Sequence, residues 1–128
     1  MKYAVKLMTD GSSQILSIPD HCDFTWYAQE IGCEWIEIVR PRNSKYVLIV
    51  DEEGLLKDNK MNPHASAIYG FLKHGQPIAG DALILKEEMG DEGPELTGVD
   101  GEVALGLKNI LDSTLEDVIH QLMNALSK

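Results

Sequence analysis

The segment from Val50 to Gly80 limits the fold of this chain more than any other, because turn and cap signals follow one another there at short intervals. An acidic turn at residues 51–54 closes the apolar run that precedes it. The Asn–Pro pair at residues 62–63 predicts a helix start, since Asn caps a helix and Pro is tolerated at the first helical position. Gly75 predicts the end of that helix. The segment therefore predicts a strand, a helix and a further strand in this order.

The spacing of apolar residues predicts the remaining elements. Strands are expected over 2–8, 14–18, 33–39 and 77–86, and the continuous apolar run over 46–50 predicts a strand buried on both faces. Helices are expected over about 20–31, 62–73 and 103–111, and a capping box at 113–116 predicts one more. The order is β-β-α-β-β-α-β-α-α. We expect an α+β fold with a mainly antiparallel or mixed sheet of about five strands and helices packed on it.

Length and composition fit a single globular domain, since the chain has 128 residues, of which 44% are hydrophobic. We expect one domain over 1–128, with an α+β core at 1–86, an acidic loop at 87–101 and a helical extension at 102–128. No apolar run approaches the roughly 20 residues that cross a membrane, and the charged, alternating N-terminus is unlike a signal peptide. We therefore expect a cytoplasmic protein without membrane contact.

The formal net charge of −10 is unevenly placed along the chain. Residues 1–64 carry a net charge of −3, and residues 65–128 carry −7. Most of the second excess lies between Lys86 and Glu102, where one base stands among seven acids. Such a surface repels nucleic-acid phosphates, so direct DNA or RNA binding is not expected. It attracts basic partners, although the same charge also serves solubility alone.

Several stretches together resemble a known family. They are residues 34–39 (EWIEIV), 50–55 (VDEEGL) and 75–80 (GQPIAG), with Asn62, Ala65 and Tyr69 between them. The pattern is similar to domain-of-unknown-function family 3846, whose small domains occur mainly in phages, plasmids and Gram-positive bacterial genomes. The resemblance covers residues 2–85, about two thirds of the chain, and the tail from Glu87 onward is longer than expected. It implies an accessory or host-interaction role on a mobile genetic element, and no particular activity.

Metal and catalytic motifs are weak in this chain. Its six His and Cys residues do not occur at the Cys-x-x-Cys or His-x-x-x-His spacing of zinc sites. His64 and Ser66 lie two residues apart on a predicted helix and so do not face each other. The acids at residues 51–53 could form an acid–base pair, but an acidic turn is the simpler interpretation. We expect no metal, no cofactor and no enzymatic activity.

The predicted helix start at residue 62 is the best location for a small-ligand site. Free backbone N–H groups at a helix start suit an anionic, nucleotide-like ligand. The candidate ligand-binding residues are Asn62, His64, Ser66, Tyr69 and Asp51. In the structural alternative Asn62 is only a cap and Tyr69 belongs to the core, which leaves His64 and Ser66 without a firm structural reason.

The last predicted helix carries an apolar face that is a candidate interface. Its residues, spaced three and four apart, are Leu115, Val118, Ile119, Leu122 and Leu126. This face would serve dimerisation or a partner if the sheet does not cover it. Trp26 and Trp35 could anchor a partner, but tryptophans in so small a domain more often belong to the core. Cys22 and Cys33 are expected to be buried free thiols.

These observations together favour a non-enzymatic binding module that acts through a protein partner or by dimerising. Binding of a nucleotide-like small molecule is one alternative. Another is an acidic decoy that occupies the DNA site of a host protein. Self-association, a nucleotide screen and the binding of a basic DNA-binding protein would separate the three.

Overall fold

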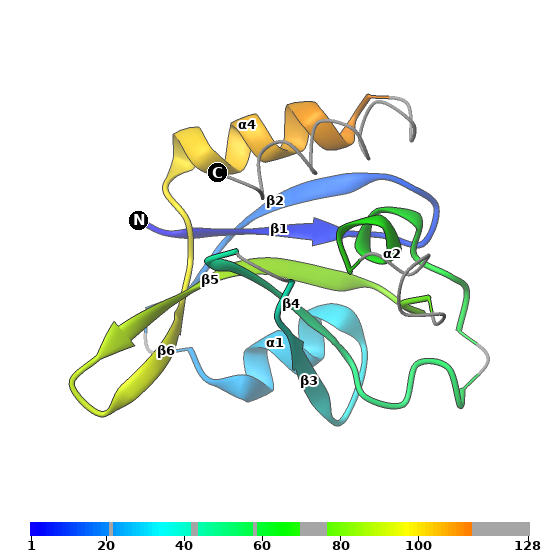
Figure 1. Cartoon of the computed structure of the whole chain (residues 1–128), viewed down its shortest axis with the longest axis horizontal. Coiled ribbons are helices and arrows are strands. Elements are labelled where there is room, and N and C mark those ends of the chain that lie inside the picture. The colour runs from blue at the N-terminus through cyan, green and yellow to red at the C-terminus, as the bar shows by residue number, and fades with distance from the viewer. Residues whose placement is uncertain (21, 42–43, 58, 70–76, 114–128) are drawn as a thin grey trace.

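The computed structural model describes residues 1–20, 22–41, 44–57, 59–69 and 77–113. Its helices and strands follow the expected order and confirm the α+β fold (Figure 1). The elements are β1 (Tyr3–Leu7), β2 (Ser13–Ser17), α1 (Phe24–Ile31), β3 (Ile36–Val39), β4 (Tyr46–Asp51), α2 (Pro63–Tyr69), β5 (Ala82–Gly90), β6 (Gly93–Thr97) and α4 (Gly101–Leu111).

The strands form one antiparallel sheet with β5 at its centre. The strand order is β2-β1-β5-β4-β3, and β6 pairs with the second half of β5. Ile84 of β5 lies between Val5 of β1 and Leu48 of β4. Every residue of β4 after Tyr46 is buried, as expected for a strand covered on both faces. The predicted antiparallel sheet is therefore confirmed.

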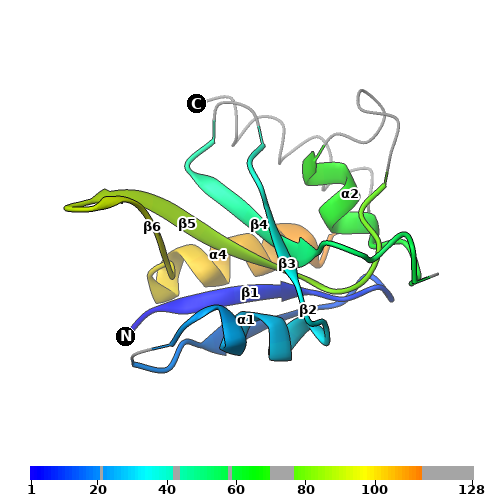
Figure 2. The same cartoon turned by 90° about the horizontal axis from the view of Figure 1, so that it is seen from below.

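Helices cover both faces of the sheet and give three layers (Figures 1 and 2). The helix α1 packs on one face, which includes Val47 and Ile49 of β4. The helices α2 and α4 pack on the other face, which includes Leu48 and Val50. This division follows from the alternation of side chains along a strand. None of the described helices is long and apolar enough to span a membrane.

The helix α1 ends at Ile31, as its sequence predicts, but begins at Phe24, after the first expected residue, 20. The side chain of Asp23 accepts a hydrogen bond of 2.9 Å from the backbone N–H of Thr25 and caps the first turn. Gly32 ends the helix in the left-handed conformation, with φ of 73°. Tyr27, buried in this helix, faces the sheet.

The segment expected to be an acidic loop is a β-hairpin over most of its length. The strand β5 continues to Gly90, and β6 returns from Gly93 with Glu88 opposite Glu95. The two residues between the glycines form the turn, which is the commonest hairpin loop length. Charged residues and glycines are depleted in strands, so their abundance here concealed β6. The loop expectation was therefore wrong for residues 87–97.

Some expected core residues lie at the surface. Trp35 is 63% exposed, so the prediction that it belongs to the core was wrong. The spacing of Phe24 three residues before Tyr27 predicts that both lie on one buried helix face, but Phe24 is 59% exposed. Cys22 and Cys33 are free thiols, as expected, but both are only partly buried. The last predicted helix lies outside the described residues, with its candidate interface of Leu115, Val118, Ile119, Leu122 and Leu126.

Gly54 lies in the turn after β4, where the backbone passes very close to Ala79. A Cβ atom on Gly54 would overlap the carbonyl oxygen of Ala79, which cannot rotate away as a side chain would. We expect Gly54→Ala to lower the free energy of unfolding by about 1–3 kcal/mol in urea denaturation.

Gly106→Ala is the matched control, because a Cβ atom on Gly106 of α4 meets nothing within 4 Å. This variant should raise the free energy of unfolding by about 0.5–1 kcal/mol, since Ala is the better helix former. Equal stabilities of the two variants would contradict the close approach at Gly54.

Candidate functional site

The five candidate ligand-binding residues lie in two different environments. Asn62, His64 and Ser66 are buried around the start of α2 and are at most 4% exposed. Asp51 and Tyr69 instead line a surface cavity beside β3 and β4. The structure thus separates the predicted helix-start residues from the concave surface that could receive a ligand.

Asn62 joins three segments of the chain. Its amide Nδ2 donates hydrogen bonds to the carbonyl oxygens of Leu7 at 2.9 Å and Gly80 at 3.0 Å. Its Oδ1 accepts a hydrogen bond of 3.0 Å from the N–H of Ala65 and so caps α2. Its own backbone N–H donates to the carbonyl oxygen of Ile78 at 2.8 Å. Asn62 is therefore a structural residue whose side chain is already occupied.

Ser66 supplies hydrogen bonds to the segment that precedes β5. Its hydroxyl accepts from the N–H of Ile78 at 2.9 Å and donates to the carbonyl oxygen of Ile78 at 3.2 Å. Ile78 is 9% exposed, so its backbone groups need partners within the protein. This contact is the structural reason for Ser66 that the sequence did not reveal.

His64 is buried, and its ring nitrogen Nδ1 has no hydrogen-bond partner among the described residues. Burial lowers the pKa of His64 below its ordinary value, and the nearby carboxylate of Asp112 opposes this shift. Asp112 in turn accepts hydrogen bonds from Lys108 at 3.0 Å and Ser13 at 3.2 Å. His64 is therefore a neutral core residue near the end of α4 at neutral pH.

Asp51 organises the turn that follows β4. Its Oδ1 accepts a hydrogen bond of 2.9 Å from the N–H of Glu53. Its Oδ2 pairs with the ammonium of Lys57 at 2.6 Å and accepts from the amide of Asn59 at 3.4 Å. The Asp51 side chain is only 4% exposed, so these contacts balance its charge inside the protein. The turn that Asp51 holds forms one wall of the cavity.

The cavity is a hollow of the surface that is open to solvent. It lies on the face of the sheet that carries α2, beside the edge strand β3. Its apolar walls are formed by Val39, Val50, Leu55, Pro77, Ile78 and Ala79. Its polar lining residues are Glu37, Asp51, Glu52 and Tyr69. Since none of these lining residues is basic, the cavity is acidic.

No described group of three His, Cys, Asp or Glu side chains lies close enough together to hold a metal ion.

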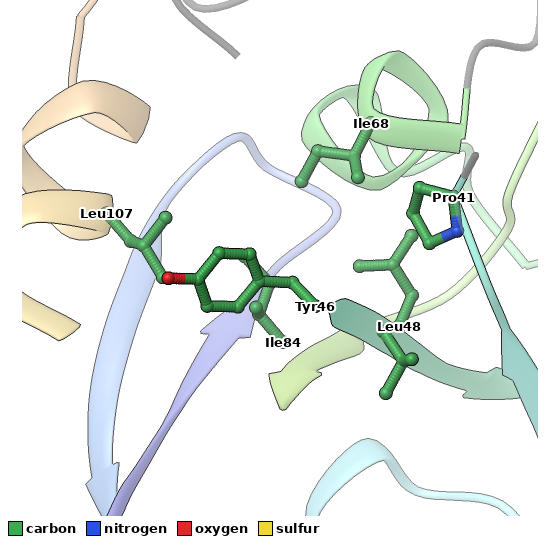
Figure 3. Close-up of a pocket in the computed structure, with 7 residues that line it drawn as sticks. Pro41, Tyr46, Leu48, Ile68, Ile84 and Leu107 are labelled. Carbon is green, nitrogen blue, oxygen red and sulfur yellow. The ribbon is translucent and has the colours of Figure 1, made fainter. Parts of the chain in front are cut away.

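An apolar groove lies between α2 and α4 (Figure 3). It is lined by Pro41, Tyr46, Val47, Leu48, Ile68, Ile84 and Leu107. The Tyr46 hydroxyl is the one polar side-chain group among these residues. Such a groove offers hydrophobic contact but few groups that could orient a polar ligand.

We call residues 86–97, from the end of β5 through β6, the arm. The arm extends beyond the body of the sheet in both views (Figures 1 and 2). Its acidic residues are Glu87, Glu88, Asp91, Glu92 and Glu95. Arg40 lowers the pKa of Glu87, and Lys86 lowers the pKa of Glu88, through direct hydrogen bonds. The other three carboxylates have no hydrogen bond or ion pair with a described residue.

Sequence reasoning identified the acidic stretch from Lys86 to Glu102 as attractive to basic partners but not as a hairpin, and it interpreted the acids at residues 51–53 as a turn. For the arm, the available signal was the spacing of Gly90 and Gly93 around two turn residues. For the cavity, only Asp51 and Tyr69 were identified. Glu37 and Glu52 carry no local sign of a shared site, because the pairing of β3 with β4 and the backbone hydrogen bond from Glu52 to Trp35 bring their segments together.

Comparisons with known proteins identify a family but no characterised relative. A family model described as Domain of unknown function (DUF3846) matches residues 1–104. The matched span includes every residue of the cavity lining and the whole arm. No curated protein and no solved structure matches the chain.

We expect Asn62→Ala to lower the free energy of unfolding by about 2–4 kcal/mol, because three buried backbone groups would lose their partner. Urea denaturation measures the change. Asn109→Ala is the control, since Asn109 is exposed on α4, and should change stability by less than about 0.5 kcal/mol. Similar effects of the two substitutions would contradict the structural role of Asn62.

We expect stability to fall more steeply from pH 7 to pH 5 in the wild-type protein than in a His64→Leu variant. The folded state lowers the pKa of His64, so below its ordinary value of 6.5 protons bind preferentially to the unfolded chain. The stability that depends on neutral His64 is present above that pH and is lost below it. Urea denaturation at pH 5, 6 and 7 measures both slopes, and carboxylates common to both proteins largely cancel in the comparison. Parallel pH profiles would show that His64 is not buried in its neutral form.

Proposed function

Since the chain belongs to the DUF3846 family, whose description assigns no activity, we propose a function from its geometry: it is a non-enzymatic interaction module that binds a basic surface of a partner protein through the arm. The observation that carries this proposal is the arm itself. It is a projecting hairpin whose strands and turn hold five acidic residues.

A binding role agrees with the state of the side chains that catalysis would need. The Ser66 hydroxyl is engaged with the backbone of Ile78, and the Asp51 carboxylate is engaged with Lys57. Burial, and to a smaller extent Asp51, raises the pKa of the Cys33 thiol. The thiol is then protonated at neutral pH and is a poor nucleophile. These groups support the structure and are not activated for chemistry.

The root of the arm is held firmly against the body of the protein. The guanidinium of Arg40 donates two hydrogen bonds, of 2.9 and 2.8 Å, to the carboxylate of Glu87. The backbone N–H of Glu87 also donates to the carbonyl oxygen of Lys45 at 3.0 Å. A paired, planar Arg–carboxylate contact fixes orientation as well as distance. The arm therefore presents its acids in a defined direction.

The charge of the arm is not explained by folding alone. Glu88 lies directly opposite Glu95, and like charges in this position destabilise an antiparallel pair. Lys86 relieves part of the repulsion by pairing with Glu88 at 2.6 Å. Local arrangements that oppose stability are expected mainly where function uses them. A basic partner surface would relieve the remaining repulsion between Glu88 and Glu95.

The arm also indicates how a partner would contact it. Met89 lies opposite Pro94, on the face that alternates with Glu88 and Glu95. Met89 is 79% exposed and offers an adaptable apolar contact. Pro94 has no N–H group, which hinders the addition of a strand along β6. We therefore propose that the partner contacts the faces of the arm and not its edge. The partner would place basic groups on the glutamates and a small apolar surface on Met89.

An acidic decoy is a narrower form of the same proposal. In that case the arm would occupy the DNA site of a basic host protein, because its carboxylates would replace phosphates. Competition between this protein and a DNA duplex for a DNA-binding partner would distinguish the decoy from an interaction at another surface.

We expect neutralisation of the arm to weaken binding of a nona-lysine peptide by about fourfold or more at low salt. The variant combines Glu88→Gln, Asp91→Asn, Glu92→Gln and Glu95→Gln. Each exposed ion pair contributes about 0.2–1 kcal/mol to the free energy of binding. The loss of four pairs therefore weakens binding by about 0.8 kcal/mol or more, which is about fourfold in the dissociation constant. Isothermal titration calorimetry at low and high salt measures the dissociation constants, and the difference should shrink at high salt.

A matched variant removes the same number of charges from elsewhere on the surface. It combines Asp20→Asn, Glu30→Gln, Glu34→Gln and Glu53→Gln, none of which lies in the arm. The dissociation constant of this variant for the peptide should be closer to that of the wild-type protein than the dissociation constant of the arm variant is. If both variants lose affinity equally, binding of the peptide depends on the net charge of the protein and the arm is not a specific binding site.

A further inference from the structure

Besides the arm, the cavity between β3, β4 and α2 has chemistry of its own. We propose that this cavity binds a positively charged group on an aliphatic stem, such as the guanidinium or ammonium end of an arginine, a lysine or a free amine. The site does not depend on the interaction proposed for the arm. It lies near the start of β5, whereas the arm forms the end of that strand (Figure 1).

The charges around the cavity are not balanced within the described part of the protein. Asp51 has its own partners in Lys57, Asn59 and the backbone N–H of Glu53. Glu37 and Glu52 line the same cavity, and neither carboxylate makes a hydrogen bond or ion pair with a described residue. They come from β3 and from the turn after β4, so they reach the cavity from different segments. A cation placed between them would gain from both.

The walls of the cavity suit a stem of methylene groups. Val39, Val50 and Ile78 form part of the core that packs under α2, and they remain within reach of the cavity. Leu55, which follows the turn after β4, is half exposed and also lines the cavity. Lysine and arginine side chains place their stems along such apolar surface while their charged ends reach polar groups. An apolar wall beside unpaired carboxylates therefore matches this ligand class.

Tyr69 adds an aromatic ring to the lining at the end of α2. A cation near an aromatic ring gains a further attraction, and guanidinium groups stack readily on such rings. An anionic ligand would meet the acidic residues Glu37 and Glu52 and no base among the described lining residues. The cavity therefore favours a cation over the nucleotide-like ligand expected from the helix start.

The direct test titrates the whole protein with L-argininamide and follows backbone amide signals by NMR. We expect saturable shifts at Val39, Val50 and Ile78, with a dissociation constant in the millimolar range. Nα-acetyl-L-citrullinamide has a similar shape but no charged group, because its urea is neutral and its α-amine is blocked, and it should shift these signals weakly or not at all. Adenosine monophosphate should not shift them either. Equal shifts with both amides, or no saturable shift with L-argininamide, would overturn the proposal.

Substitutions locate the binding site. Glu37→Gln and Glu52→Gln should each weaken binding of L-argininamide by about two- to fivefold, and their combination should weaken it further. Glu34→Gln and Glu53→Gln are matched controls, because both residues are exposed, lie close in sequence and do not line the cavity. They should leave the affinity unchanged, as should neutralisation of the arm. If the control pair weakens binding as much as the cavity pair, the cation binds through general charge and the proposal fails.

A last comparison identifies the source of the cation. A blocked Gly-Arg-Gly peptide presents an arginine side chain in a protein-like form, whereas spermidine presents free ammonium groups. Binding of the peptide at the cavity supports recognition of a partner's side chain. Binding of spermidine and L-argininamide without the peptide supports a free amine. Failure of all three ligands to shift the cavity signals would overturn the proposal, even if the arm binds its basic peptide.

Discussion

The arrangement around α2 depends on the buried side chain of Asn62. This one residue bonds the end of β1 through Leu7, the turn before β5 through Gly80, and the first turn of α2 through Ala65. A satisfied hydrogen bond contributes only about 0.5–1.5 kcal/mol, but an orphaned buried group costs about 1–3 kcal/mol. The effect of Asn62 therefore comes mainly from three backbone groups that would otherwise have no partner.

The cavity follows from this junction. Asn62 and Ser66 both bind the backbone of Ile78, and they hold residues 77–79 beside the start of α2. The turn after β4 approaches the same segment so closely that Gly54 has no room for a side chain beside Ala79. Two ordered segments thus face each other across the end of β4. Glu37 and Glu52 are among the residues that line the space between these segments.

The two acidic surfaces of the protein lie in segments outside the centre of the hydrophobic core. The first half of β5 is buried between β1 and β4 and is apolar, whereas its second half pairs only with β6 and is rich in glutamate. Glu88 and Glu95 face each other there without a contribution to the core. The cavity is also at a margin, because β3 is an edge strand. Both proposed binding surfaces therefore occupy ends or edges of the same sheet.

Local rules of the chain account for much of the fold. The apolar run of β4, the Asp23 cap and Gly32 end of α1, and the capping position of Asn62 each follow from neighbouring residues. The hidden strand β6 and the exposed side chains of Phe24 and Trp35 did not follow from such rules. Strand pairing and burial depend on which distant segments meet, and one chain's local pattern does not specify that choice.

The hydrogen bonds of Asn62 separate what the sequence can predict from what it cannot. Its bond to Ala65, three residues away, is a local interaction that the Asn–Pro signal predicts. Its bonds to Gly80 and Leu7, 18 and 55 residues away, exist only because β1 and β5 lie side by side. The sequence by itself determined the α+β class, the acidic character and most element positions, because these depend on composition and on neighbours. Only the tertiary structure decided that Asn62, His64 and Ser66 are core residues and that Glu37, Asp51, Glu52 and Tyr69 share a cavity, because long-range strand order brings those segments together.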